Sequence, residues 1–221
     1  MKTNLKTICC KLIFISVLLA SQLNAQTVQN YSLPSLLSEN KLEITNGVRF
    51  IKSTDEGKDA ITIDVLEQVA WLKGVNFSNG EIELDLKGKD ALQNSFLGVA
   101  FHGLNDTTYD AIYFRPFNFQ ATDSVRHIHA VQYISRPDYP WERLRKEQNA
   151  KYEKAIIPAP DPNAWFHARI VVNNGRVKVY VNNASTPSLE VDKLNKQKNG
   201  KIGVWLNGNF ASFANLKVTN Y

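Results

Sequence analysis

The chain has 221 residues and a formal charge of +5, from 26 Lys and Arg against 21 Asp and Glu. Its two cysteines, Cys9 and Cys10, precede an apolar N-terminal run, so a disulfide, a zinc-thiolate centre and a cysteine nucleophile are excluded for the rest of the chain. A basic patch or nucleic-acid-reading motif is not apparent outside the mixed charge run 143–154, so we expect no nucleic-acid partner.

Residues 1–25 have the pattern of a secretory signal peptide. Three lysines precede the apolar run 12–20, and Ala25 supplies a small residue at the cleavage position. The run is shorter than the roughly 20 apolar residues of a membrane helix, so we expect no membrane span. Cleavage after Ala25 removes those lysines and lowers the formal charge to +2. We therefore expect a secreted or periplasmic protein in which 26–221 forms a single domain, because no Pro/Gly/Ser-rich linker divides it.

The first part of this domain consists of short alternating runs of polar and apolar residues. We expect strands at 41–45, 48–52, 60–66, 69–75 and 80–86. The first two flank Asn46-Gly47, a pair that tolerates the backbone angles of a tight two-residue turn, so they are predicted to form a hairpin.

Three apolar-periodic segments follow at 95–104, 108–119 and 127–135, and they are predicted to be the middle strands of one antiparallel sheet. In the first segment Leu97, Val99 and Phe101 are bulky, whereas the alternate positions hold Gly98, Ala100 and His102. One face of this sheet therefore packs and the other stays open to a ligand.

The remaining chain holds a long connection and four more strands. Residues 136–162 lose the period of two, and a connection of that length is more often a functional loop than filler. Its middle is predicted to form a short helix that begins near Pro140. Strands are then expected at 165–172 and 176–182, around the turn pair Asn174-Gly175, and at 200–206 and 210–218.

About a dozen short strands with regular turn signals indicate an all-β fold, an antiparallel β-sandwich. The order of the pieces, ending in VKVYVNN and then GKIGVWLNGNFASFANLKV, resembles the concanavalin A-like lectin/glucanase superfamily, especially its laminin-G-like and 3-keto-disaccharide hydrolase-like domains. That resemblance implies a jelly roll. It leaves the activity open, because the fold hosts lectins, glycosidases, lyases and adhesion modules.

A ligand site is predicted on the open face of the central sheet. Tyr113 and Arg115 share one face of their strand, and Arg115 precedes Pro116, which ends the ladder. We expect them to bind a ligand together with His102 and Gln132. Either the His129, Val131 and Tyr133 set or the Ala130, Gln132 and Ile134 set of the third strand faces outward, and the sequence leaves that parity open. Trp141 in the long loop and Trp205 in a late strand are further ligand-binding candidates, as stacking platforms for a sugar ring.

Two other patterns are weighed against simpler interpretations. Glu81, Glu83 and Asp85 share a strand face in a way similar to the catalytic strand of family 16 glycoside hydrolases, but an ordinary solvated face of charged residues is favoured. His127 and His129 stand two apart, yet no third ligand is clear, so we expect no metal site. Phosphate-loop, HExxH and Ser-His-Asp patterns are missing from the sequence, and we expect no cofactor.

These observations favour a carbohydrate-binding β-sandwich whose partner is an oligo- or polysaccharide. The alternative is a glycan-active enzyme, for which the resemblance implies a glycoside hydrolase or a 3-keto-glycoside hydrolase or lyase. Its candidate catalytic residues are His102 or His129 as the base and Arg115 as the electrostatic stabiliser. A non-catalytic module that docks another protein through this face is the third possibility.

Overall fold

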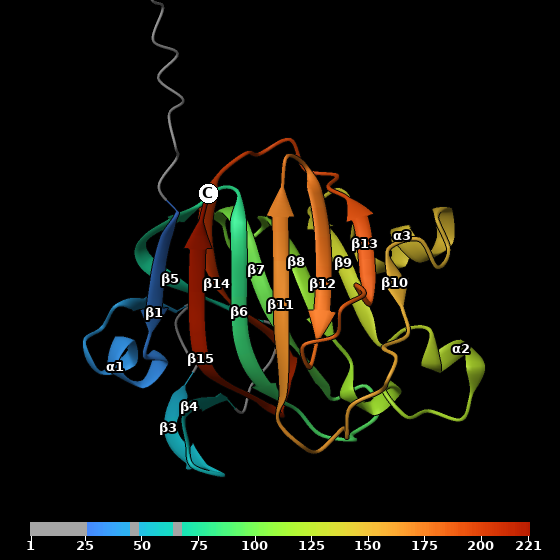
Figure 1. Cartoon of the computed structure of the whole chain (residues 1–221), viewed down its shortest axis with the longest axis horizontal. Coiled ribbons are helices and arrows are strands. Elements are labelled where there is room, and N and C mark those ends of the chain that lie inside the picture. The colour runs from blue at the N-terminus through green and yellow to red at the C-terminus, as the bar shows by residue number, and fades with distance from the viewer. Residues whose placement is uncertain (1–25, 45–48, 64–67) are drawn as a thin grey trace, which may run out of the picture.

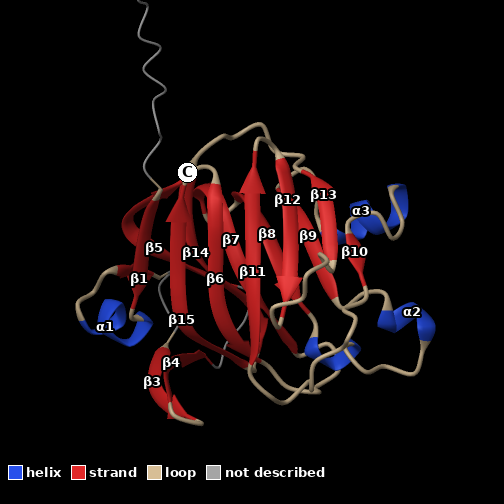
Figure 2. Cartoon of the chain, viewed as in Figure 1, coloured by secondary structure: helices blue, strands red, loops and turns tan. Residues whose placement is uncertain are grey.

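The computed structural model describes residues 26–44, 49–63 and 68–221. In this part of the chain, two antiparallel sheets of eight and seven strands pack face to face, and short helices lie at the periphery (Figures 1 and 2). The predicted all-β antiparallel sandwich is confirmed. The predicted signal peptide at 1–25 lies outside the described residues.

The eight-stranded layer, sheet A, lies toward the viewer in Figure 1. Its strand order is β13-β12-β11-β6-β15-β4-β3, and β1 also pairs with β15. Its strands are β1 (Thr27–Tyr31), β3 (Phe50–Asp55), β4 (Lys58–Ile63), β6 (Gly80–Lys87), β11 (Phe166–Asn173), β12 (Arg176–Val181), β13 (Leu189–Asp192) and β15 (Ala211–Asn220).

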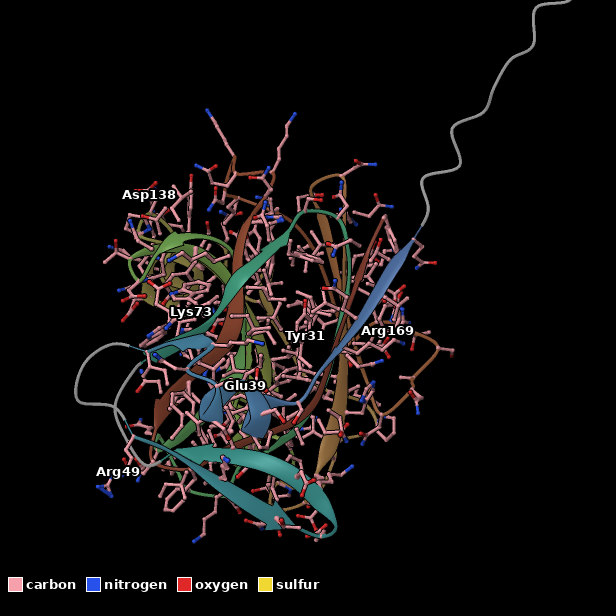
Figure 3. All side chains as sticks on the ribbon, turned by 90° about the vertical axis from the view of Figure 1, so that its left-hand side faces the viewer. Tyr31, Glu39, Arg49, Lys73, Asp138 and Arg169 are labelled. Atoms are coloured by element: carbon pink, nitrogen blue, oxygen red, sulfur yellow. The ribbon has the colours of Figure 1, made fainter. Side chains whose placement is uncertain are left out.

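The seven-stranded layer, sheet B, lies behind it in the order β10-β9-β8-β7-β14-β5-β2. Its strands are β2 (Leu42–Glu43), β5 (Gln68–Phe77), β7 (Ser95–Asn105), β8 (Thr108–Phe114), β9 (Val131–Arg136), β10 (Glu153–Lys154) and β14 (Gly200–Gly208). Figure 3 turns the molecule by 90°, and its labels Asp138 and Arg169 mark the sheet B and sheet A sides.

Short helices frame the sandwich at two places. The helix α1 (Leu33–Ser38) lies beside β1, whereas α2 (Ser124–His127) and α3 (Trp141–Glu147) lie at the end of the molecule that carries β9 and β10 (Figure 1). A 3-10 turn, η1 (Pro116–Asn118), directly follows β8. No helix of the described residues is long and apolar enough to cross a membrane.

The turn chemistry that predicts hairpins is right in one place and wrong in another. Asn174 and Gly175 take positive φ angles and join β11 to β12, and the predicted pairs such as Ile170 with Val179 are confirmed. The predicted hairpin at 41–52 is wrong, because β2 pairs with β5 in sheet B while β3 pairs with β4 in sheet A. The turn pair Asn46-Gly47 itself lies outside the described residues.

The core lies between the sheets and is made by the inward half of each alternating strand. Leu97, Val99 and Phe101 of β7 face inward, as predicted, and are at most 1 % exposed. Phe114 of β8 meets Phe166 of β11 across the interface, with ring centroids 5.1 Å apart in an edge-to-face arrangement. Because this half of each strand builds the core, the alternate residues of sheet B are left for its outer face.

Candidate functional site

A pocket of about 740 Å³ lies on the outer face of sheet B, within the 300–1,000 Å³ range typical of small-molecule sites. Strands β7, β8, β9 and β14 form its floor, and the segment from η1 to α3 forms its walls. Its lining comprises Leu92, Gln93, Phe96, Tyr113, Arg115, Phe117, Asn118, Arg126, His129, Ile134, Arg136, Pro140, Trp141, Glu142, Arg145, Trp205 and Asn207.

The floor is built on one row of residues that crosses the sheet. Backbone register aligns Trp205, Gly98, Tyr113, Gln132 and Glu153 on five successive strands. Gly98 has no side chain, so the rings of Trp205 and Tyr113 meet over it with centroids 4.7 Å apart and planes inclined by 31°. Trp205, one of the predicted stacking residues, therefore lines the pocket.

Arg115 fixes the positions of its neighbours in the floor. Its guanidinium donates to the phenol oxygen of Tyr113 at 2.7 Å, to Oε1 of Gln132 at 2.5 Å and to the backbone carbonyl of His129 at 3.0 Å. Gln132 is fully buried beneath the lining, and its Oε1 also accepts from the Tyr113 hydroxyl at 3.1 Å. Burial raises the pKa of Tyr113 to about 12, so this phenol stays protonated at neutral pH.

A buried carboxylate, Glu153, binds the basic groups on this side of the pocket. It is 1 % exposed and accepts two hydrogen bonds from Arg145, at 2.9 and 2.7 Å. Its oxygens also lie 3.6 Å from Nη1 of Arg115 and 3.4 Å from Nε2 of His129. Burial lowers the pKa of His129 against the opposing pull of Glu153, so this imidazole is neutral at pH 7.

Trp141 stands at the rim, at the first position of α3. Its side chain is 40 % exposed, and the guanidinium of Arg145 lies 4.8 Å from its ring centroid. Leu144, three residues on, is buried and anchors the helix. The short helix predicted for the long connection is confirmed, and its Arg145 points to Glu153 and the pocket.

His102 does not belong to this pocket, so the predicted site shared by His102 and Arg115 is wrong in that respect. His102 is 1 % exposed, its Nε2 donates to the carbonyl of Ser78 at 2.7 Å, and its Nδ1 lies 3.6 Å from Asp110. The reason is a β-bulge, because His102 has a φ of 50° and the register of β7 shifts between Phe101 and Asn105. Because the bulge interrupts the alternation of side chains along β7, His102 does not share the outer face with Gly98.

In the third central strand, β9, the alternate residues Gln132 and Ile134 face the pocket side of the sheet. Ile134 lines the pocket, whereas Tyr133 points inward and donates to Asp110 at 2.7 Å. The predicted strand 127–135 begins too early, because Asp123 caps α2 and residues through His127 are helical. His129 reaches the pocket from the turn before β9, so the two histidines do not share a strand face.

The three carboxylates of β6 lie on the outer face of sheet A, across the sandwich from the pocket. Glu83 pairs with Lys217 at 2.8 Å, and Asp85 pairs with Lys58 and His167 at 2.8 Å each. Glu81 accepts from the hydroxyl of Tyr221 at 2.6 Å. Each carboxylate is occupied by a partner, in agreement with a charged structural face.

The geometry can be compared with known proteins. The family model of 3-keto-alpha-glucoside-1,2-lyase-like domains matches residues 39–219, which is most of the chain. This chain belongs to that family. The resemblance drawn from the sequence is confirmed, and the pocket therefore lies in a 3-keto-glucoside lyase-like domain. No curated protein matches its sequence.

Solved structures share the fold of this lyase-like domain at low sequence identity. The carbohydrate-binding module CBM66 from Bacillus subtilis has a TM-score of 0.58 and 14 % identity, covering 80 % of this chain and 95 % of the module. A B. subtilis protein with a galectin-like fold has a TM-score of 0.58 and 12 % identity, covering 87 % and 94 %. A native glycosidic hydrolase has a TM-score of 0.55 and 13 % identity, covering 87 % and 95 %.

Of the predicted ligand-binding residues, Tyr113, Arg115, Trp141 and Trp205 line this lyase-like domain's pocket. Gln132 was predicted to contact the ligand as well, but it is fully buried beneath the lining, where its oxygen accepts from Arg115 and Tyr113. Sequence reasoning missed six other residues of the lining, Phe96, Phe117, Asn118, Arg126, Arg136 and Arg145, and it missed Glu153 beneath them. A usable signal was present, because arginines recur between 115 and 145 around a long connection. No sequence pattern marks Glu153 as part of the site, because its strand β10 is only two residues long.

Proposed function

We propose that this protein binds an oligo- or polysaccharide in the pocket on the outer face of sheet B. The observation that carries the proposal is the Tyr113 and Trp205 floor, enclosed by guanidinium donors and by the exposed rim residue Trp141. A sugar ring offers an apolar C–H face to aromatic rings and hydroxyl edges to hydrogen-bond donors, so a pocket of this composition suits it.

The fold neighbours support this proposal. One is a carbohydrate-binding module and another a glycosidic hydrolase, and both cover most of the described sandwich. The N-terminal signal pattern at 1–25 further supports an exported protein, in contact with extracellular or periplasmic glycans.

A polysaccharide panel tests this function. The purified protein is run by affinity electrophoresis through gels containing neutral β-glucan, xylan, polygalacturonate or κ-carrageenan. Tryptophan fluorescence is recorded in parallel, because Trp141 and Trp205 line the pocket. We expect retardation by at least one polysaccharide together with a change in emission. No retardation and no emission change with any of them would contradict saccharide binding.

A second function, glycan cleavage, is favoured by the contacts of His129. Its neutral imidazole lines the pocket, lies 3.4 Å from Glu153 and shares that carboxylate with Arg115. A neutral imidazole can accept a proton from a bound saccharide or water, and the guanidinium can stabilise the negative charge that develops. Membership in a lyase-like family supports the same reaction class.

Replacing His129 separates binding from catalysis. In a binding protein His129→Gln lowers affinity at most, whereas in an enzyme it lowers turnover of a cleaved glycan by about 100-fold or more with binding retained. His167→Gln on sheet A is the matched control and leaves both quantities unchanged. Product formation that survives His129→Gln at the native rate would exclude His129 as the base.

A further inference from the structure

We propose that the saccharide bound in this pocket is anionic, and that Arg126 and Arg136 bind its carboxylate or sulfate groups. The inference rests on the proposed saccharide-binding function and adds the charge class of the ligand. It depends on how the charged side chains around the pocket are paired with one another.

Positive charge exceeds negative charge in the pocket wall. Four guanidinium groups line it, from Arg115, Arg126, Arg136 and Arg145, whereas Glu142 is the one carboxylate of the described lining. Glu153 lies just beneath and adds a second carboxylate. With His129 neutral, these groups leave two positive charges in excess. Low-dielectric walls strengthen the field of such an excess inside a cleft.

The carboxylate of Glu153 is committed to two of the arginines. It holds Arg145 in a bidentate pair, and this hydrogen bond raises the pKa of that guanidinium. It also lies 3.6 Å from Nη1 of Arg115, and the two Nη groups of Arg115 donate to Tyr113, Gln132 and the backbone carbonyl of His129. Arg115 and Arg145 are therefore parts of the pocket framework.

Arg126 has no carboxylate partner for its guanidinium among the described residues. The side chain donates to Oδ1 of Asn118 at 3.2 Å and to the carbonyl of Phe117, both neutral acceptors. Asp123 is nearby, but it accepts from the backbone N–H of Arg126 to cap α2. These contacts orient the guanidinium in the pocket wall and leave its charge uncompensated.

Arg136 is the less satisfied of the two. Its half-buried side chain lines the pocket, and its Nε is buried without a hydrogen-bond partner in the described structure. No carboxylate pairs with this guanidinium among the described residues, so an anionic ligand in the pocket would supply its counter-charge. The guanidinium fork also matches the oxygens of a carboxylate or sulfate better than it matches a single hydroxyl.

Matched polysaccharide pairs separate charge from sugar identity. Polygalacturonate is compared with its methyl ester, and κ-carrageenan with its desulfated backbone, by isothermal titration calorimetry on the purified protein. We expect one acidic member to bind at least about ten-fold more tightly than its neutral partner, since charge-assisted hydrogen bonds are roughly twice as strong as neutral ones. The pair that shows the difference identifies the anion as carboxylate or sulfate.

Arginine variants locate the anion within the pocket. Arg136→Gln and Arg126→Gln are each expected to weaken binding of the acidic polysaccharide by about ten-fold and to weaken binding of the neutral partner less, so that the preference for the acidic member narrows. Arg143→Gln is the matched control, because Arg143 lies on the same helix as Arg145 but pairs with Glu147 outside the pocket. Should Arg126→Gln alter the unfolding temperature, Arg136→Gln carries the test.

The outcomes distinguish this inference from the proposed function. Tighter binding of the neutral members, or equal binding of both members with no effect of either arginine variant, overturns the anionic ligand and leaves saccharide binding intact. Binding of neither member of any pair, together with a negative panel, overturns both. An equal loss of affinity in Arg143→Gln assigns the effect to general surface charge and also overturns the inference.

Discussion

The rings of Tyr113 and Trp205 meet at 4.7 Å across an intervening strand, because Gly98 between them has no side chain. An added Cβ at Gly98 would come within 2.0 Å of the carbonyl oxygen of Ile112 and 2.6 Å of the Cα of Tyr113. The aromatic floor of the pocket therefore depends on a glycine at this position.

Gly98→Ala is expected to destabilise the protein by about 2–4 kcal/mol, since backbone atoms of β8 must move to admit the methyl group. Urea denaturation measures the change. Gly175→Ala is the matched control, because no heavy atom lies within 4 Å of its added Cβ and only the cost of its positive φ remains, about 1 kcal/mol. Equal losses in the two variants would show that the Gly98 contact is unimportant.

Glu153→Gln is expected to lower the free energy of unfolding by about 3–5 kcal/mol, because it leaves Arg145 and Arg115 without their buried counter-charge. The comparison is Glu147→Gln, which breaks an exposed, solvent-screened helical pair with Arg143 and is expected to change the free energy of unfolding far less. Chemical denaturation of both variants at one pH tests the difference. A small loss in Glu153→Gln would mean that the buried cluster does not hold the pocket together.

The pair of His167 and Asp85 on sheet A predicts a pH-dependent stability. The hydrogen bond to Asp85 raises the pKa of His167, while burial of Asp85 is outweighed by hydrogen bonds from His167, Lys58 and Asn215 that lower the pKa of the carboxyl. A raised histidine pKa stabilises the fold below its unfolded value of about 6.5, and this contribution is lost as pH rises through the folded value.

His167→Gln removes that contribution. The excess stability of the native protein over the variant should be larger at pH 5.5 than at pH 8.5, a window in which Asp85 stays ionised. Unfolding free energies at the two pH values give the difference directly, and the effects of the other histidines cancel because both proteins contain them. A difference that is constant, or that grows with pH, contradicts the pairing.

Trp141→Ala is expected to weaken saccharide binding by about ten-fold or more, as truncation of a tryptophan anchor at a binding site commonly does. It changes stability by less than about 1 kcal/mol, because the ring is 40 % exposed and loses one cation–π contact with Arg145. Leu104→Ala is the control. Leu104 is 50 % exposed and lies at the end of β7 opposite the pocket residue Phe96. Calorimetric titration with the same polysaccharide compares them.

The sequence predicted the sandwich and half of the pocket for the same reason, namely the alternation of side chains along β7, β8 and β14. That period placed Tyr113 and Arg115 outward and Phe114 inward, as the structure has them. It failed at His102, because a bulge is a local backbone event that the residue types do not announce. It also failed at 127–130, where an Asp cap converts an apolar run into a helical turn.

The other half of the pocket could not be predicted, because it depends on long-range placement. Arg126 and Arg145 lie in segments with no period of two, and only the three-dimensional path of those segments brings them to the same pocket as Tyr113. Glu153 joins sheet B through a two-residue strand that pairs with Gln132. Pairings that short carry no pattern in the sequence.

The most direct test of the central claim is the response of the four indole N–H signals to a bound saccharide, followed by heteronuclear NMR on the ¹⁵N-labelled protein. The probe is tetragalacturonate, or the oligosaccharide of highest affinity in the panel. The signals of Trp141 and Trp205 should shift with saturation, because both residues line the pocket. Those of Trp71, which donates to Asp106, and of Trp165 should stay in place. Saturable binding that moves Trp165 and leaves Trp141 and Trp205 unchanged would contradict a binding site on sheet B.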